Sequence, residues 1–143
     1  MVEPSELFTS TFLFTANYTG ENLSGEISFK KLGEEKYEIA FFAPENLTGY
    51  SVYAEGETVT LDYMGIKSER GICELPDEHP LRAITHAIYL SQYGQATRNE
   101  TGAGDEVFTF PDGTKITLFA GVVKEIDVPA AKATFKISGF EKI

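Results

Sequence analysis

The sequence predicts a mainly β (α+β) protein: a strongly curved antiparallel sheet, or incomplete β barrel, of about ten strands with one helix packed on its concave side. Three observations lead to this fold class. Apolar residues alternate with polar ones through most of the chain, which is typical of half-buried strands. Short turns join these runs, and such links connect antiparallel neighbours because parallel crossovers are much longer. A single stretch has helical spacing. The 143 residues fit one domain, residues 1–143.

The first half of the chain predicts six successive strands. From Phe8 to Tyr18 an aromatic face alternates with a threonine face, and both residue types favour strands. Pro44 ends the third strand because it cannot donate a hydrogen bond to a ladder. Residues 66–72 are more polar, so we place this strand near an edge. Four predicted strands lie between the first strand and residues 66–72. Their apolar faces are formed, strand by strand, by Ile27 and Phe29, by Tyr37, Ile39 and Phe41, by Tyr50, Val52 and Ala54, and by Val59, Leu61 and Tyr63.

A helix is predicted to follow the six strands. Pro80 suits its first turn, and the helix ends near Gly94. Asp77 or Glu78 suits the positive N-terminal end of this helix. Its apolar stripe consists of Leu81, Ile84 and Ile88.

The remaining chain returns to strands after a polar segment. Residues 95–105 are polar and contain glycine, which predicts a mobile loop. Apolar alternation then predicts strands around residues 107–110, 116–118, 122–126 and 133–137.

The helix is too small to cover the predicted sheet. A helix of 14 residues spans about 20 Å, so either the sheet folds over on itself or part of its concave side lines a cavity. Aromatic side chains there suit an apolar ligand, but the same side chains can equally form a core by packing against one another and the helix. The candidate ligand-binding residues are Phe12, Phe14, Phe29, Tyr37, Phe41, Tyr50, Tyr63, Ile84 and Ile88.

The charge balance narrows the range of partners. Twelve basic and 22 acidic residues give a net charge of −10, which argues against binding to nucleic-acid phosphates or to an anionic membrane surface. No run approaches the length of about 20 apolar residues that a transmembrane helix needs. A single cysteine excludes an intramolecular disulfide framework.

No sequence motif for catalysis, metal binding or a cofactor is present, so we predict no catalytic residue, no metal and no cofactor. His79 is interpreted as a solvated residue at the helix start, and His86 as a partly buried helix residue. Cys73 is interpreted as a small strand residue. The paired acids Glu34 and Glu35 are interpreted as solvated turn carboxylates.

The arrangement of these segments resembles the bacterial LolA-like (lipoprotein-localisation-factor-like) superfamily. The resemblance covers most of the chain. It is carried by residues 33–39, the break at 43–47, residues 50–53 and 55–63, the helix from Pro80 to Tyr93, and residues 112–116 and 133–140. It implies an incomplete, strongly curved β barrel with an apolar concave face. Members of this superfamily carry lipoprotein acyl chains or bind lipids, and many are lipid-anchored envelope proteins. The resemblance implies no catalytic residues in this chain.

Two functions therefore remain open. The first is a non-enzymatic binder or carrier of an apolar ligand, a lipid or acyl chain, in the bacterial cell envelope. The second is an envelope protein–protein interaction module with a filled core. In both cases we expect an exported protein, in the envelope or extracellular, with an N-terminal lipid anchor possible in the full-length protein.

Overall fold

The computed structural model describes residues 3–21, 24–43, 48–76 and 79–143. Within them the chain forms an eleven-stranded antiparallel sheet. The strands are β1 (Phe12–Thr19), β2 (Ser24–Gly33), β3 (Lys36–Ala43), β4 (Tyr50–Glu55), β5 (Thr58–Tyr63), β6 (Ile66–Gly71), β7 (Thr97–Glu100), β8 (Asp105–Thr109), β9 (Lys115–Phe119), β10 (Val122–Val128) and β11 (Ala133–Lys142).

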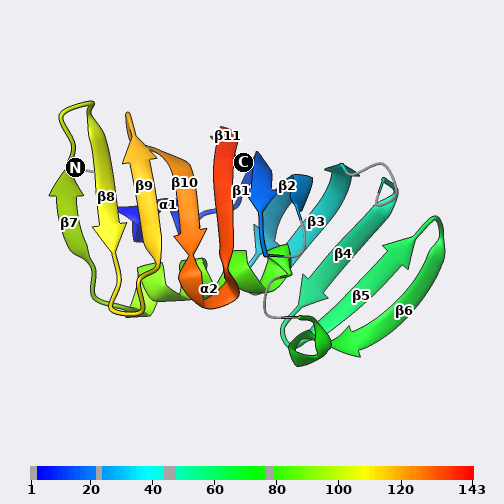
Figure 1. Cartoon of the computed structure of the whole chain (residues 1–143). Coiled ribbons are helices and arrows are strands. Elements are labelled where there is room, and N and C mark those ends of the chain that lie inside the picture. The colour runs from blue at the N-terminus through cyan, green and yellow to red at the C-terminus, as the bar shows by residue number, and fades with distance from the viewer. Residues whose placement is uncertain (1–2, 22–23, 44–47, 77–78) are drawn as a thin grey trace.

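The strand order is open rather than closed. It runs β6-β5-β4-β3-β2-β1-β11-β10-β9-β8-β7, so the described sheet has β6 at one edge and β7 at the other (Figure 1). Two meanders, β1–β6 and β7–β11, meet where β1 pairs with β11. The prediction that residues 66–72 lie at an edge is confirmed by β6.

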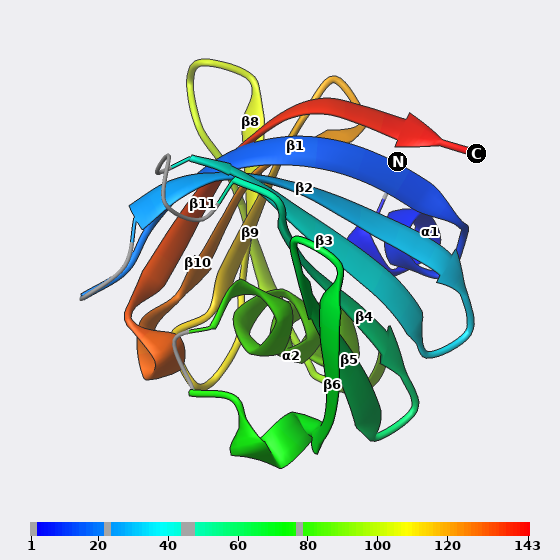
Figure 2. The ribbon, with the colours of Figure 1, turned by 90° about the vertical axis from the view of Figure 1, so that its right-hand side faces the viewer.

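Among the described residues, two α-helices accompany the sheet. The predicted helix is confirmed as α2 (Pro80–Tyr93), which lies against one face of the sheet (Figure 2). A short helix α1 (Pro4–Phe8) precedes β1, and 3-10 turns η2 (Ile72–Glu74) and η3 (Pro129–Ala131) lie between longer elements. In the described part of the chain, no helix has the length and hydropathy needed to cross a membrane.

The end of α2 depends on a close backbone approach. A Cβ atom at Gly94 would lie 2.7 Å from the Leu90 carbonyl oxygen and 3.1 Å from a ring carbon of Phe110. Only glycine fits this position without displacing its neighbours. The chain therefore turns away from the helix at the residue that the sequence indicates.

The core lies between the sheet and the two helices. It includes a group of phenylalanine rings around Phe12, whose ring centroid lies 6.1 Å from Phe14, 6.0 Å from Phe29 and 5.2 Å from Phe140. From the helix, Leu81, Ile84, Ala87 and Ile88 are buried as well. Aromatic rings in such stacked pairs add to the free energy of burial.

Several local expectations are corrected by the structure. The segment predicted as a mobile loop contains strand β7, which pairs with β8. Phe8 belongs to α1 rather than to the first strand. Cys73 lies in η2 and is exposed. The expectations for Pro44, Asp77 and Glu78 fall outside the described residues.

Candidate functional site

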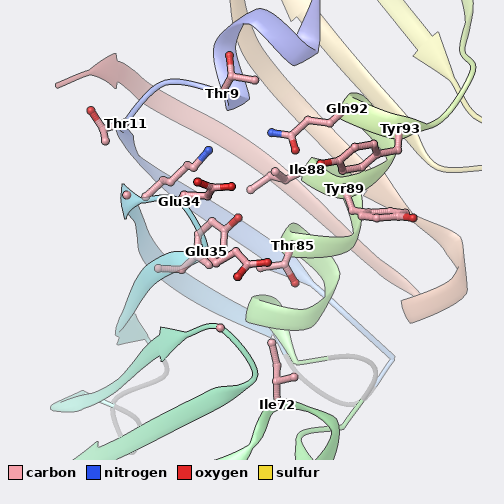
Figure 3. Close-up of a pocket in the computed structure, with 14 residues that line it drawn as sticks. Thr9, Thr11, Glu34, Glu35, Ile72, Thr85, Ile88, Tyr89, Gln92 and Tyr93 are labelled. Carbon is pink, nitrogen blue, oxygen red and sulfur yellow. The ribbon is translucent and has the colours of Figure 1, made fainter.

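A cleft of about 600 Å³ opens between α2 and the sheet end where β2 turns into β3. Its walls come from the α1–β1 connection, the β2–β3 hairpin, the β4–β5 turn, η2 and one side of α2 (Figure 3). The lining residues are Thr9, Thr11, Lys31, Gly33, Glu34, Glu35, Tyr37, Gly56, Ile72, Thr85, Ile88, Tyr89, Gln92 and Tyr93. A cavity of this size is within the range of small-molecule sites.

The helix side of the cleft carries its largest exposed aromatic surface. Tyr89 and Tyr93 stand one turn apart on α2, with ring centroids 5.0 Å apart, and are 59% and 73% exposed. Buried Ile88 lies beside them in Figure 3. These side chains give the helix side of the cleft an apolar wall.

The sheet side of the cleft is polar at the hairpin and apolar further along. The two-residue β2–β3 connection consists of Glu34 and Glu35, and both side chains are exposed, as the sequence predicts. Tyr37, the second residue of β3, is half-buried against Phe29, with ring centroids 5.6 Å apart. Burial, and then the nearby Glu35 carboxylate, raise the pKa of the Tyr37 phenol. The phenol is therefore a neutral hydrogen-bonding group at neutral pH.

Lys31 is a charged residue on an otherwise apolar strand face. It continues the period-two series of Ile27 and Phe29 and is only 6% exposed. Its Nζ donates a hydrogen bond of 2.6 Å to the Phe8 carbonyl oxygen. Burial lowers the pKa of this amine, while the Glu34 carboxylate opposes the shift. The site residues predicted from the sequence do not include Lys31, although a lysine in register with two apolar strand residues is a visible signal.

The structure distributes the nine predicted site residues over three locations. Tyr37 and Ile88 line the cleft. Tyr50 is half-buried and Tyr63 is 42% exposed, with ring centroids 6.5 Å apart on neighbouring strands β4 and β5. The others are buried in the core: Phe12, Phe14, Phe29, Phe41 and Ile84. Of the nine predicted site residues, the structure therefore places two, Tyr37 and Ile88, in the cleft with the lining residues of the β2–β3 hairpin and α2.

His79 is buried rather than solvated, which corrects the interpretation from the sequence. It is 6% exposed and caps α2, because its Nδ1 accepts a hydrogen bond of 3.2 Å from the Leu81 backbone N–H. Its ring lies edge-on to Phe41 and Tyr50. Burial lowers the pKa of His79 from 6.5 to about 4, so the imidazole is neutral at neutral pH.

A second, smaller cleft of about 180 Å³ includes His86, which is partly buried as the sequence predicts. The His86 Nε2 lies 2.7 Å from the Asp112 Oδ2. Burial raises the pKa of Asp112, but hydrogen bonds from His86 and Thr114 outweigh this and leave it below its usual value. This contact links α2 to the turn before β9. Among the described residues, no group of three or more His, Cys, Asp or Glu side chains is arranged to hold a metal.

Fold and cleft together define a class of protein: an open antiparallel sheet, a helix on one of its faces, and a cleft between the two. The structure is similar to the crystal structure of a LolA superfamily protein from Nitrosomonas europaea, the superfamily that the sequence resembles. The similarity covers 98% of this chain and 90% of that one, with 7% identity and a TM-score of 0.48. No protein-family model matches the sequence, and no curated protein is similar to it in sequence.

Proposed function

We propose that the protein is a non-enzymatic binder or carrier of an apolar ligand, a lipid or acyl chain, and that it acts in the bacterial cell envelope. The observation that carries this proposal is the cleft of about 600 Å³ beside α2. Exposed Tyr89 and Tyr93 and buried Ile88 line it, and covering such apolar area with a ligand is favourable. The envelope location, an export segment and a lipid anchor rest on the sequence resemblance alone.

The predicted strongly curved sheet, whose concave side holds the ligand, is part of the same proposal. The position of α2 against one face of the sheet supports it, since the cleft lies on that side. We infer that Tyr37 and Ile88 contact the ligand directly. The buried phenylalanines Phe12, Phe14, Phe29 and Phe41, with Ile84, Tyr50 and Tyr63, contact it only if the core opens around it.

Titration with the uncharged fluorophore 1,6-diphenylhexatriene tests the proposal. We expect saturable binding near one dye per chain. Tyr89→Ala and Tyr93→Ala should each weaken binding about tenfold, because losing roughly 50 Å² of apolar contact costs about 1.3 kcal/mol. Both tyrosines are exposed, so these variants should fold. Tyr53→Ala is the control, since Tyr53 is also an exposed tyrosine but does not line the cleft.

Two results of the dye titration would count against the carrier function. Absence of saturable binding in the wild-type protein would reject the carrier function. Equal weakening by the Tyr53 control would show that the dye binds to exposed aromatic surface in general, which would also count against it.

The alternative, an envelope interaction module with a filled core, is favoured by a different observation. The β5–β6 hairpin exposes three large side chains, with Tyr63 42%, Met64 74% and Ile66 76% exposed. Clustered exposed apolar side chains are typical of protein contacts. For this function, Met64→Glu and Ile66→Glu should abolish capture of a protein partner from envelope extract and leave dye binding unchanged. The carrier function predicts that Tyr89→Ala alters dye binding instead.

A further inference from the structure

We propose that the cleft takes an amphiphile with a single anionic head group, a carboxylate or a phosphate ester, and that the Lys31 ammonium binds this head group. This inference rests on the proposed function and deepens it, because it names the chemical class of the ligand. It is carried by the joint position of a buried cation and an apolar wall in one cleft.

The hydrogen bonding of Lys31 is the first argument. An ammonium group has three N–H donors and no acceptor. Among the described residues, the Phe8 carbonyl is the one group recorded as accepting from Nζ, at 2.6 Å. Leaving donors of a buried charged group without acceptors costs free energy. A carboxylate or phosphate in the cleft would supply acceptors of the opposite charge.

A purely structural role for Lys31 accounts for only part of this arrangement. The Phe8 carbonyl lies at the C-terminal end of α1, where a cation is favourable. That role uses only one of the three donors of the ammonium group. Glu34 influences Lys31 through space, but no ion pair between the two is found in the part of the chain that the structure describes. The buried charge therefore lacks a paired counter-charge.

The remaining lining determines what else the ligand carries. Tyr37, Ile72 and Ile88 offer apolar surface in the same cleft as Lys31, and this surface suits an alkyl chain attached to the head group. The exposed carboxylates of Glu34 and Glu35 line the cleft as well. They repel negative charge on the ligand, so an amphiphile with one acidic group is disfavoured less than one with several.

The test compares three ligands with the same C16 chain: palmitate, hexadecyl phosphate and hexadecanol. The two acids are used below their critical micelle concentrations, and hexadecanol below its solubility limit. Competition against diphenylhexatriene reports their affinities. We expect the wild-type protein to bind at least one of the two acids tenfold or more tightly than the alcohol. Which of the two binds better distinguishes a carboxylate ligand from a phosphate ester.

Two variants assign that preference to Lys31. Lys31→Met keeps the length of the side chain and removes its charge, so the acids should fall to the affinity of hexadecanol while hexadecanol binding persists. Lys30→Met is the matched control: it makes the same charge change one residue earlier on β2, on the opposite face, and should keep the preference for acids.

Glu34→Gln keeps the inference testable if Lys31→Met does not fold, since Glu34 is an exposed turn residue. Removing this carboxylate should strengthen binding of the preferred acid about threefold and leave hexadecanol unchanged. Equal affinity of the wild type for acids and alcohol would overturn the role of Lys31 while leaving the proposed carrier function intact. Failure of all three ligands and of the dye to bind would instead overturn the proposed function.

Discussion

Mild acid should destabilise the protein through one buried imidazole, that of His79. Its pKa in the folded state is about 4, against 6.5 for a histidine in water. Protonation would place a charge between the rings of Phe41 and Tyr50. It would also remove the Nδ1 lone pair that accepts from the Leu81 N–H at the start of α2.

The sign and size of the effect follow from linkage. Above pH 6.5 the imidazole is neutral in both states, and His79 makes no pH-dependent contribution. As the pH falls from 6.5 to 4, the unfolded chain binds a proton that the folded protein excludes, so the free energy of unfolding decreases. The pKa difference corresponds to a loss of roughly 3 kcal/mol by pH 4.

Urea unfolding at a series of pH values measures this loss. His79→Asn keeps a side chain that can cap the helix but does not titrate in this range, so its stability should fall by roughly 3 kcal/mol less than that of the wild type between pH 7 and pH 4. His86→Asn is the control and should retain the wild-type contribution of His79. If His79→Asn and the wild type show the same pH dependence, or if NMR titration finds a His79 pKa near 6.5, the reasoning is refuted.

Three further predictions concern stability. Phe29→Ala removes a fully buried ring and should lower the free energy of unfolding by about 3–5 kcal/mol, measured in urea. Ala120→Asn should raise the melting temperature by about 2–4 °C, because Ala120 has a φ of 53° beside Gly121 at 81° in the β9–β10 turn, and Asn-Gly favours that geometry. Asp112→Asn should cost up to about 1 kcal/mol at neutral pH by weakening the contact with His86. Because the pKa of Asp112 is lowered on folding, its contribution is present above its usual value and lost as the pH falls through the folded value.

Each of these predictions has a contrary outcome. A loss below about 1 kcal/mol for Phe29→Ala would mean that the surrounding rings collapse into the space. A lower melting temperature for Ala120→Asn would contradict the turn assignment. An Asp112→Asn variant that matches the wild type at pH 7 and diverges from it at pH 3 would contradict the sign derived for that carboxylate.

Most of the sheet could be predicted from the sequence because its strands bury one face each. Ile39 and Phe41, like Val52 and Ala54, recur at period two and are buried in the structure. Strand β7 could not be found this way because its four residues, Thr97–Glu100, bury no apolar side chain. It is held by backbone pairing with β8 and by the salt bridge between Arg98 and Glu106, neither of which leaves a hydrophobic pattern.

The cleft was harder to predict than the sheet. Its lining combines Tyr37 and Ile88, which belong to apolar patterns, with the charged residues Lys31 and Glu34. The sequence pattern assigns Glu34 to a solvated turn and does not address Lys31. The burial of His79 depends on Phe41 and Tyr50, which are distant in sequence. Local periodicity carries no information about such long-range contacts, so the charged groups of the cleft and the buried histidine required the structure.

The pairing of β1 with β11 has a consequence for the order in which the protein folds. These strands join residues such as Thr15 and Ser138, which are 123 positions apart, at the middle of the sheet. During synthesis the β1–β6 meander leaves the ribosome with one side of β1 unpaired, and it waits in that state until β11 has been made. Contacts so distant along the chain form slowly, and an unpaired strand edge favours association with other chains. The nascent chain is thus vulnerable to aggregation until β11 has left the ribosome and paired with β1.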